Sequence, residues 1–390
     1  MKASRSYLSH TVEELAPSGI RKFFDLANSM KGVISLGVGE PDFVTSWGIR
    51  EAAINSLEKG YTSYTANAGL LELRNEIATY MNDRFDVQYK EEEEIIVTVG
   101  ASQALDLAFR SILNPGDEVI IVEPSFVSYA PLVILSGGIP VRIQAKADNE
   151  FVLQPEELKA AITNKTKAIL LCSPNNPTGT VMNKSDYEQL LPIIKEEDLL
   201  VISDEIYAEL VYEEEHICIA SLADMKERTI VINGFSKGFA MTGWRLGFIC
   251  APAFLTEAML KIHQYSMMCA PTSAQYAAIE ALREGIKDLD EMKRSYRQRR
   301  NYFVASCNDI GLSCHVPGGA FYSFPSIKET GLTSAEFAER LLMEERVAVV
   351  PGDVFGKSGE GHIRCSYASS MNQLQEAIRR MSSFMEKYSK

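Results

Sequence analysis

The sequence predicts an α/β protein in which helices cover both faces of a mainly parallel sheet. Between about residue 95 and residue 250, short apolar runs alternate with longer amphipathic ones, and the short runs lack the polar alternation of a half-exposed strand. Continuous apolar strands separated by helices are typical of parallel sheets that are buried on both faces. A chain of 390 residues, 46% of them hydrophobic, is long enough for about two domains.

The elements of this sheet are expected in a regular order. Strands are predicted in "EIIVTVG", "EVIIV", "IPVRI", "KAILL", "LLVIS", "RTIVIN" and "RLGFICA". The intervening amphipathic runs are predicted as helices, namely "ASQALDLAFRSIL", "SFVSYAPLVILSG" and "DYEQLLPIIKEE".

A second, smaller domain is expected to follow the sheet. The run "LDEMKRSYRQRRNYFVASCNDIG" predicts one long helix, because apolar residues recur mostly every three or four positions. That stripe consists of Leu289, Met292, Tyr296, Phe303, Cys307 and Ile310. Further strands are predicted in "SCHVPGGAFYSFP", "RVAVVPG" and "HIRCSYA", and a closing helix in "MNQLQEAIRRMSSFMEK". We expect a large domain over residues 46–285 and a small α+β domain formed by residues 1–45 and 286–390.

The composition excludes some classes of function. A net charge of −13 argues against a nucleic-acid-binding protein, because binding to phosphates requires clustered Lys and Arg in excess. The N-terminus lacks the apolar region of a signal peptide, and no segment approaches the roughly 18 consecutive apolar residues of a membrane span. A cytoplasmic protein with neither a nucleic-acid nor a membrane partner is therefore expected.

The cysteines and histidines predict no metal site. The seven cysteines are odd in number and scattered, with no CxxC motif and no Cys/His spacing suited to zinc. We interpret them, including Cys172, Cys250 and Cys365, as packing thiols in a reducing compartment. The five histidines show no metal spacing and receive no catalytic role.

Residues just after the strands are the candidates for function, because ligands of such sheets bind beyond the carboxyl ends of the strands. Lys237 is one of them, in "NGFSKGFAMTGWR". It is flanked by glycines that allow a close backbone approach, namely Gly234, Gly238, Gly243 and Gly247. A surface lysine is the alternative. If the amine is partly buried, its pKa is lowered and its neutral form is able to attack a carbonyl.

Two further strand ends carry groups that match a cofactor. Asp204 directly ends an apolar strand, with capping of the next turn as the alternative to a functional carboxylate. In "VGASQAL" the free N–H groups of a helix start and the Ser102 hydroxyl suit a phosphate, with a simple helix cap at Ser102 as the alternative. The amine of Lys237, the carboxylate of Asp204 and the cation of Arg245 match the aldehyde, ring nitrogen and phosphate of pyridoxal phosphate. We therefore predict that cofactor.

With these residues in place, the chain resembles the fold type I pyridoxal-phosphate aminotransferases of class I, in the branch of prokaryotic aspartate and aromatic aminotransferases. The resemblance covers nearly the whole chain. It rests on motifs that occur in family order: "SLGVGEPDF", "YTSYTANAGLLELR", "PNNPTG", "SDEIY", "SKGFAMTGWRLG", "PGGAFY" and "HIRCSYA". It implies transfer of an amino group from an L-amino acid to a 2-oxo acid, with 2-oxoglutarate expected as the acceptor, in a ping-pong mechanism.

The resemblance also implies how the residues hold the cofactor. Lys237 is expected to bind it as a Schiff base and to shuttle the proton, and Asp204 to pair with the pyridinium nitrogen. Tyr207 and Asn176 are expected to hydrogen-bond the 3-oxygen of the ring. An aromatic ring is expected to stack on the cofactor; Phe126 is the first choice and Tyr129 the second. The phosphate is expected to be held by Ala101, Ser102, Ser236, Arg245 and Tyr64 of the partner subunit.

The substrate is expected to be held by its α-carboxylate. The resemblance assigns this carboxylate to Arg364, with Gly39 and Asn176 beside it. A turn residue at Asn176, a strand aromatic at Tyr64 and a surface ion pair at Arg364 are the alternatives. Because the family completes each site with residues of a second chain, a homodimer is implied, and the small domain is expected to close over the substrate.

Two departures from the family pattern bear on the site. Gly234 stands where many members have a hydroxyl residue, which predicts the loss of one phosphate contact or its replacement by backbone. Ser102 stands where aspartate-using members often have a lysine, which argues against strict aspartate specificity. We expect aromatic or dicarboxylic donors. Candidate side-chain contacts are Arg21 or Lys22 for a second carboxylate, and Phe23, Phe24, Tyr64 and Tyr322 for an aromatic ring.

Other functions remain open at this point. A β-lyase or a decarboxylase uses the same cofactor residues, and an aminotransferase specialised for N-acyl diaminopimelate is a further possibility. A non-catalytic sensor domain is a remote alternative, because the net charge is strongly negative.

Overall fold

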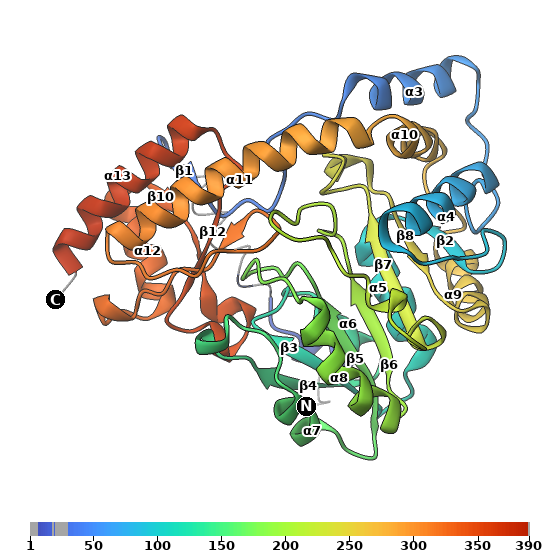
Figure 1. The fold of residues 1–390 in the computed structure, drawn as a ribbon, viewed down its shortest axis with the longest axis horizontal. Helices are drawn as coiled ribbons and strands as arrows, with labels where there is room; N and C mark the ends of the chain where they lie inside the picture. Colours follow the sequence, from blue (N-terminus) through green and yellow to red (C-terminus); the bar gives the residue numbers. More distant parts are fainter. Residues whose placement is uncertain (1–6, 18, 20–29, 389–390) are drawn as a thin grey trace, which may run out of the picture.

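The computed structural model describes residues 7–17, 19 and 30–388, and its larger part is built on a seven-stranded sheet (Figure 1). The strand order is β2–β8–β7–β6–β5–β3–β4. The strands span Ile95–Thr98 (β2), Glu118–Glu123 (β3), Ile139–Gln144 (β4), Thr166–Cys172 (β5), Leu200–Asp204 (β6), Thr229–Gly234 (β7) and Gly247–Cys250 (β8). β8 is antiparallel to both its neighbours, and the other pairs are parallel. The predicted, mainly parallel α/β sheet is confirmed.

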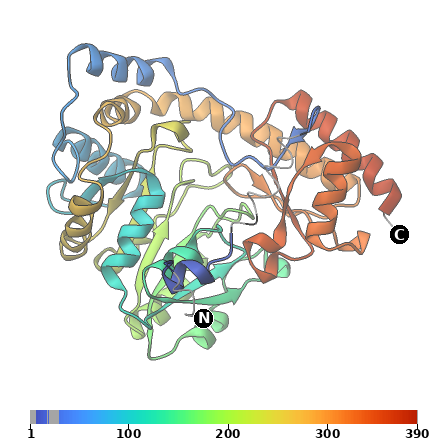
Figure 2. The same ribbon diagram turned by 180° about the vertical axis from the view of Figure 1, so that it is seen from behind.

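Helices cover both faces of this sheet because its strands are apolar on both sides. One face packs against α5 (Gly100–Ile112), α6 (Tyr129–Leu135) and α9 (Ala253–Ser266). The other packs against α4 (Leu71–Phe85), α7 (Pro155–Ala161), α8 (Lys184–Glu196) and α10 (Thr272–Arg283). In β3 the alternation is direct: Ile120 belongs to the core under α8, and Val119 and Ile121 to the core under α5. α3 (Trp47–Glu58) packs on α10 at the edge of the molecule (Figure 2).

The long helix α11 (Ile286–Asp309) links this sheet to the C-terminal region, residues 310–388 (Figure 1). Its predicted stripe is buried at Leu289, Met292, Tyr296, Phe303 and Cys307. Ile310 follows the last helical residue and is half-buried. The stripe also contains a residue that its polarity hid from the pattern: Arg300 is buried on the same face.

The C-terminal region contains small sheets packed on two helices. β11 (Val350–Pro351), β12 (Ile363–Ser366) and β9 (Tyr322–Ser323) form an antiparallel sheet, and β1 (Ile34–Ser35) pairs with β10 (Val347–Ala348). The helices α12 (Ser334–Glu345) and α13 (Met371–Tyr388) cover them. The closing helix is therefore confirmed. The short helix α1 (His10–Glu14) lies near α6 of the larger part.

Two sequence predictions were too long. Of "SCHVPGGAFYSFP" only Tyr322–Ser323 is a strand. The glycines before it lie in close contact with other loops: a Cβ on Gly319 would lie 2.5 Å from Pro174 Cγ and 2.8 Å from the Leu210 carbonyl oxygen. Of "SFVSYAPLVILSG" only Tyr129–Leu135 is helical, after a turn that follows Pro124.

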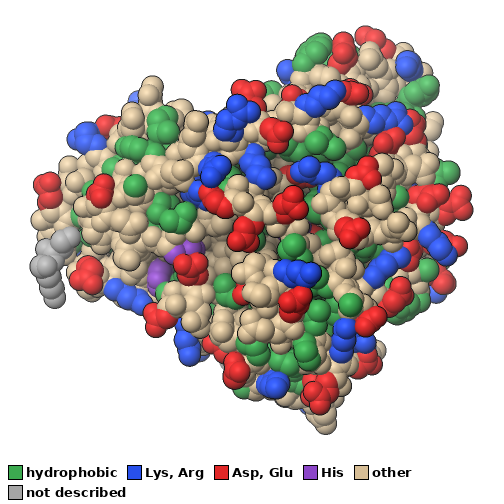
Figure 3. All heavy atoms as spheres, in the orientation of Figure 1, with side chains coloured by type: hydrophobic (Ala, Val, Ile, Leu, Met, Phe, Trp, Pro, Cys, Tyr) green, Lys and Arg blue, Asp and Glu red, His purple; other side chains and the backbone are tan. Residues whose placement is uncertain are grey.

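The surface agrees with the composition. Acidic and basic side chains are intermixed on the face shown in Figure 3, without an extended basic patch there. None of the helices in the described parts of the chain is both long and apolar enough to cross a membrane.

Candidate active site

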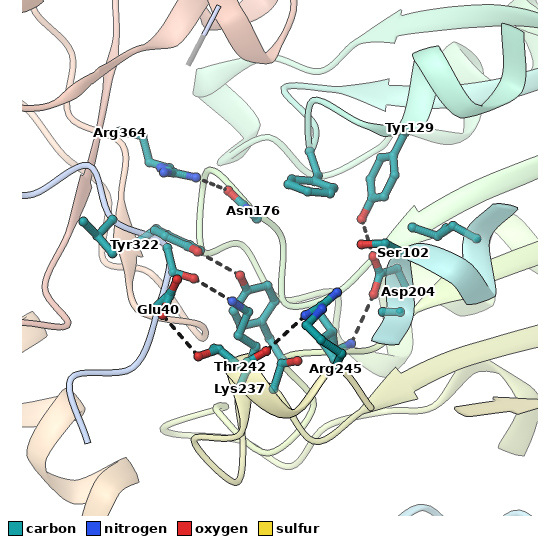
Figure 4. Close-up of a pocket in the computed structure, with 18 of the residues that line it drawn as sticks. Glu40, Ser102, Tyr129, Asn176, Asp204, Lys237, Thr242, Arg245, Tyr322 and Arg364 are labelled. Atoms are coloured by element: carbon teal, nitrogen blue, oxygen red, sulfur yellow. Dashed lines mark hydrogen bonds between the residues drawn. The ribbon is translucent and has the colours of Figure 1, made fainter. Parts of the chain in front are cut away.

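A cavity of about 810 Å³ lies beyond the carboxyl ends of the parallel strands, between the large sheet and the C-terminal region (Figure 4). Most of the site residues predicted from the sequence line this cavity. Its lining includes Gly39, Ala101, Ser102, Phe126, Asn176, Asp204, Tyr207, Ser236, Lys237, Arg245 and Arg364. Residues more than 300 positions apart in the chain therefore meet in one site.

Lys237 projects into this cavity from the loop after β7. Its Nζ donates a hydrogen bond to the carbonyl oxygen of Gly39 at 2.6 Å. Burial lowers the pKa of the Lys237 amine to about 8, and the charge of Glu40 opposes that shift. The surface-lysine alternative is wrong, and a larger fraction of this amine is neutral at pH 7 than in an exposed lysine.

Asp204 is the last residue of β6, and its buried carboxylate has no cationic hydrogen-bond partner among the described residues. Oδ2 accepts from the Tyr129 hydroxyl at 2.7 Å, and Oδ1 accepts from the Ile206 N–H at 3.2 Å. The bond from Ile206 is the turn-capping contact proposed as the alternative. That alternative is therefore correct for Oδ1 but does not explain the bond at Oδ2. Burial raises the pKa of Asp204 to about 6.

The two aromatic candidates take different positions. The Phe126 ring lies edge-on to Tyr129, with ring centroids 5.6 Å apart and an interplanar angle of 77°. Because the hydroxyl of Tyr129 is bonded to Asp204, we assign Tyr129 to orienting that carboxylate rather than to stacking. Phe126 is half-buried and lines the cavity.

Arg245 lies opposite the start of α5. Its backbone is in the left-handed region (φ 54°), and Nη1 donates to the Thr242 carbonyl oxygen at 3.1 Å. Gly100 (φ 78°) makes room for its guanidinium, since a Cβ there would lie 2.8 Å from Arg245 Nη2. The cap alternative for Ser102 is wrong: α5 is capped at Val99, and Ser102 is exposed in the first turn.

Two of the glycines near Lys237, Gly234 and Gly247, are in close contact with backbone atoms. Gly234 and Gly247 face each other across β7 and β8. A Cβ on Gly234 would lie 2.9 Å from Gly247 Cα, and one on Gly247 would lie 2.8 Å from Ala101 N. These contacts bring the start of α5 onto the sheet. They also leave little space for a side chain at position 234.

Arg364 is 4% exposed and has no carboxylate partner among the described residues. Nη1 donates to Asn176 Oδ1 at 2.9 Å, and Nη2 donates to the Gly37 carbonyl oxygen at 2.7 Å. Its Nε has no hydrogen-bond partner. The surface-ion-pair alternative for Arg364 is therefore wrong. Asn176 does lie in a turn, as its alternative proposed, but its side chain also bonds Arg364.

Two lining residues, Glu40 and Tyr322, were missed as site residues or assigned differently. Glu40 follows Gly39 in "SLGVGEPDF", and its Oε2 accepts from the Thr242 hydroxyl at 3.1 Å. Its place next to Gly39 was the only signal. Tyr322, considered only as an aromatic wall for the substrate, lies with its hydroxyl 2.8 Å from that of Tyr207.

Some predicted residues lie outside the cavity. Tyr64 is 80% exposed, does not line the cavity and is not in a strand. Arg21, Lys22, Phe23 and Phe24 lie outside the described residues.

All seven cysteines are free, and burial raises the pKa of the Cys172, Cys250 and Cys365 thiols. Within residues 7–17, 19 and 30–388, no group of three or more His, Cys, Asp or Glu residues is arranged to hold a metal ion.

The fold and the site define an α/β enzyme whose cavity combines an amine of lowered pKa, a buried carboxylate and two arginines. The family model "Aminotransferase class I and II" matches residues 31–381. The chain belongs to this family, and it is an amino-acid aminotransferase.

Its relatives agree with that assignment. The chain is 63% identical to the Bacillus subtilis protein named "Putative aminotransferase YugH", over 98% of this chain and 99% of the relative. It is 49% identical to an aspartate aminotransferase of Pyrococcus abyssi, over 96% and 97% of the two chains. Among solved structures, an aromatic aminotransferase of Pyrococcus horikoshii matches with a TM-score of 0.90 and 46% identity, covering 95% of this chain and 99% of that one.

Proposed function

We propose that this enzyme is a pyridoxal-phosphate-dependent aminotransferase that moves the amino group of an aromatic or dicarboxylic L-amino acid to a 2-oxo acid, 2-oxoglutarate being the expected acceptor, by a ping-pong mechanism. One observation carries the proposal. The charged side chains of Lys237, Asp204 and Arg245 share one cavity, and none of them is paired with an opposite charge among the described residues.

The residues present fit the cofactor. Asp204 is a carboxylate whose pKa is raised by burial, and a pyridinium nitrogen would supply a cation that stabilises its charged form. Ala101 and Ser102 open α5 with free N–H groups beside Arg245 and Ser236, which suits a phosphate dianion. Phe126 offers a flat apolar face, and Asn176 and Tyr207 offer hydrogen bonds to the 3-oxygen.

When bound, pyridoxal phosphate withdraws electrons from the α-carbon of the attached amino acid and so acidifies its Cα–H bond. Lys237 is the base within reach. Because burial keeps its pKa near 8, its amine accepts a proton and returns it at neutral pH. The hydrogen bond to Gly39 orients Nζ while no substrate competes for it.

Arg364 is proposed to bind the α-carboxylate of the substrate. Its hydrogen bonds to Asn176 and Gly37 fix the plane of the guanidinium and use neutral acceptors, so its charge stays available for an anion. The unpartnered Nε is a further donor. Fixing the carboxylate at one end and the amino group near Lys237 orients the Cα–H bond.

The proposed range of amino donors rests on the other side chains that line the cavity. Among the described residues that line the cavity, the cations are Lys237, Arg245 and Arg364, and each has a proposed partner. Ser102 offers a hydroxyl instead of a fourth cation. Relatives named for aspartate and for aromatic amino acids are both similar to this chain, which supports a broad donor range.

The proposed assembly is a homodimer in which Tyr64 of the partner subunit reaches the phosphate. The 80% exposure of Tyr64 in the single chain supports this arrangement. We also propose a large domain over residues 46–285 and a small domain of residues 1–45 and 286–390 that closes over the substrate. The free cysteines support a cytoplasmic location.

A near-UV and visible spectrum of the protein mixed with single amino acids and then with 2-oxoglutarate tests this function. The expected result is a visible band that bleaches with particular donors, returns with the oxo acid and is lost in Lys237→Ala. Absence of any band after addition of pyridoxal phosphate would overturn the cofactor assignment. Release of pyruvate and ammonia in place of an oxo acid would identify a β-lyase.

A further inference from the structure

Tyr322 contacts two residues of the proposed site, Arg364 through its ring and Tyr207 through its hydroxyl. It is 1% exposed, and it lies in β9 opposite Ser366 of β12. Arg364 is two residues before Ser366 on the same strand, so Arg364 and Tyr322 are diagonal neighbours on one face of the small sheet. The register of this sheet therefore sets their contact.

The ring of Tyr322 packs against the guanidinium of Arg364. The guanidinium carbon lies 4.5 Å from the Tyr322 ring centroid and 5.0 Å from that of Phe355. These two rings and the acceptors on Asn176 and Gly37 hold a buried guanidinium that lacks a carboxylate. Cation–π contact of this kind orients the cation and leaves its N–H groups free for a ligand.

The hydroxyl of Tyr322 meets the cofactor side of the cavity. It lies 2.8 Å from the hydroxyl of Tyr207. It also lies beside Gly39, where a Cβ would approach it to 2.8 Å. The backbone of Gly39 accepts the hydrogen bond of Lys237, so Tyr322 packs against the segment that orients the amine.

We propose that Tyr322 is a positioning residue that couples the carboxylate-binding Arg364 to Tyr207. This inference rests on the proposed function. A hydroxyl that donates to the 3-oxygen of the cofactor has its own oxygen free to accept. Tyr207 therefore accepts from Tyr322 while it donates to the cofactor, and each bond polarises the other. The Tyr322 ring acts separately, by holding Arg364 in the plane that meets the substrate carboxylate.

The two roles separate in two variants. Tyr322→Phe keeps the ring and removes the hydroxyl, and Tyr322→Leu removes both. The pH midpoint of the absorbance change of the bound cofactor reports on the 3-oxygen. Losing the hydroxyl weakens donation to that oxygen, so both variants are expected to raise the midpoint by about half a pH unit. Only Tyr322→Leu is expected to raise the KM for the amino donor, by about tenfold.

A double-mutant cycle tests the coupling to Tyr207. Tyr207→Phe alone is expected to raise the midpoint further than Tyr322→Phe, and adding Tyr322→Phe to it is expected to change nothing more. The matched control for the ring is Phe355→Leu, which touches Arg364 without reaching Tyr207. That variant is expected to raise the KM and leave the midpoint at the wild-type value.

The outcomes distinguish this inference from the proposed function. If the wild-type protein shows no cofactor band, the proposed function fails before any variant is measured. With the band present, an unshifted midpoint in Tyr322→Phe, or shifts that add in the double variant, would overturn the coupling. Equal KM values for Tyr322→Phe and Tyr322→Leu would overturn the role of the ring. Because Tyr322→Phe preserves the packed volume, its result stands even if Tyr322→Leu fails to fold.

Discussion

Two buried arginines of this molecule, Arg300 and Arg364, differ in whether a carboxylate accepts their hydrogen bonds. Arg300 is 2% exposed on α11, stacks over Tyr212 at 4.8 Å and donates to both carboxylate oxygens of Glu213, at 2.6 and 2.5 Å. Arg364 is 4% exposed and stacks over Tyr322 at 4.5 Å, but its acceptors are an amide and a backbone carbonyl.

The difference separates structure from function. A buried charge is costly unless it is paired, and the hydrogen bonds from Arg300 lower the pKa of Glu213, as expected of a settled ion pair. Arg364 lacks such a partner and faces a cavity. Because Arg364 faces the cavity and is oriented by neutral acceptors without being neutralised, we propose that it binds an anionic ligand, the substrate carboxylate.

Removing Arg364 has the largest expected effect. Arg364→Leu is expected to lower kcat/KM for amino donors about a thousandfold, because the substrate carboxylate loses its charged donor. The free energy of unfolding is expected to fall by less than about 1 kcal/mol, since no buried carboxylate is left unpaired. Steady-state kinetics and denaturant unfolding check the two parts. A large loss of stability with little change in kinetics would make Arg364 a structural residue like Arg300.

Giving Arg364 the partner that Arg300 already has is the next test. Asn176→Asp places a carboxylate 2.9 Å from the guanidinium, where it competes with the substrate. The KM for amino donors is expected to rise about a hundredfold, and by clearly more than in the control Asn176→Ala. Equal KM values in the two variants would show that the charge of position 176 is irrelevant to substrate binding.

Removing Arg300 is expected to affect folding and not chemistry. Arg300→Leu breaks the bonds to Glu213 and to the Pro317 carbonyl, and is expected to cost about 2 kcal/mol of unfolding free energy. Glu213 is partly exposed and recovers hydration, which limits the loss. The kcat/KM of the folded variant is expected to stay within about threefold of wild type. A KM increase comparable to that of Arg364→Leu would erase the contrast.

Lys237 extends the contrast to a second cation, because its amine is bonded to a carbonyl and not to a carboxylate. Burial disfavours its charged form, so the proton leaves at about pH 8 instead of 10.5. Below pH 8 the neutral fraction, and with it the rate at which the apoenzyme takes up pyridoxal phosphate, is expected to fall about tenfold per pH unit. Stopped-flow absorbance between pH 6 and 10 measures this rate. A flat profile would show that deprotonation of Lys237 does not limit uptake.

The two walls of the cavity also differ in how far sequence could predict them. Lys237 and Asp204 follow strands of one parallel sheet, so the rule for strand ends brought them together before any coordinates were known. Glu40 and the pairing of Tyr207 with Tyr322 depend on the packing of distant segments, which no local pattern encodes. Arg364 was found through the resemblance to a family, and its lack of a carboxylate partner only through the structure.

Local patterns failed where tertiary packing decided the outcome. The polarity of Arg300 masked its burial in an apolar stripe, because its charge is paired across the fold. Gly234 and Gly247 were expected to allow a close backbone approach, but the sequence did not show that the approaching backbone is each other's and the start of α5. Ser102 had a suitable side chain for a cap but lies one turn too far into the helix.

The most direct measurement compares the binding of 3-phenylpropionate and 3-phenylpropionamide to the cofactor-loaded enzyme, followed by the change in visible absorbance. These ligands share a ring and differ in charge. We expect the acid to bind wild type at least about tenfold more tightly than the amide, and this preference to disappear in Arg364→Leu but to persist in Arg300→Leu. An acid preference that survives in Arg364→Leu would contradict the assignment of the unpaired arginine to the substrate carboxylate.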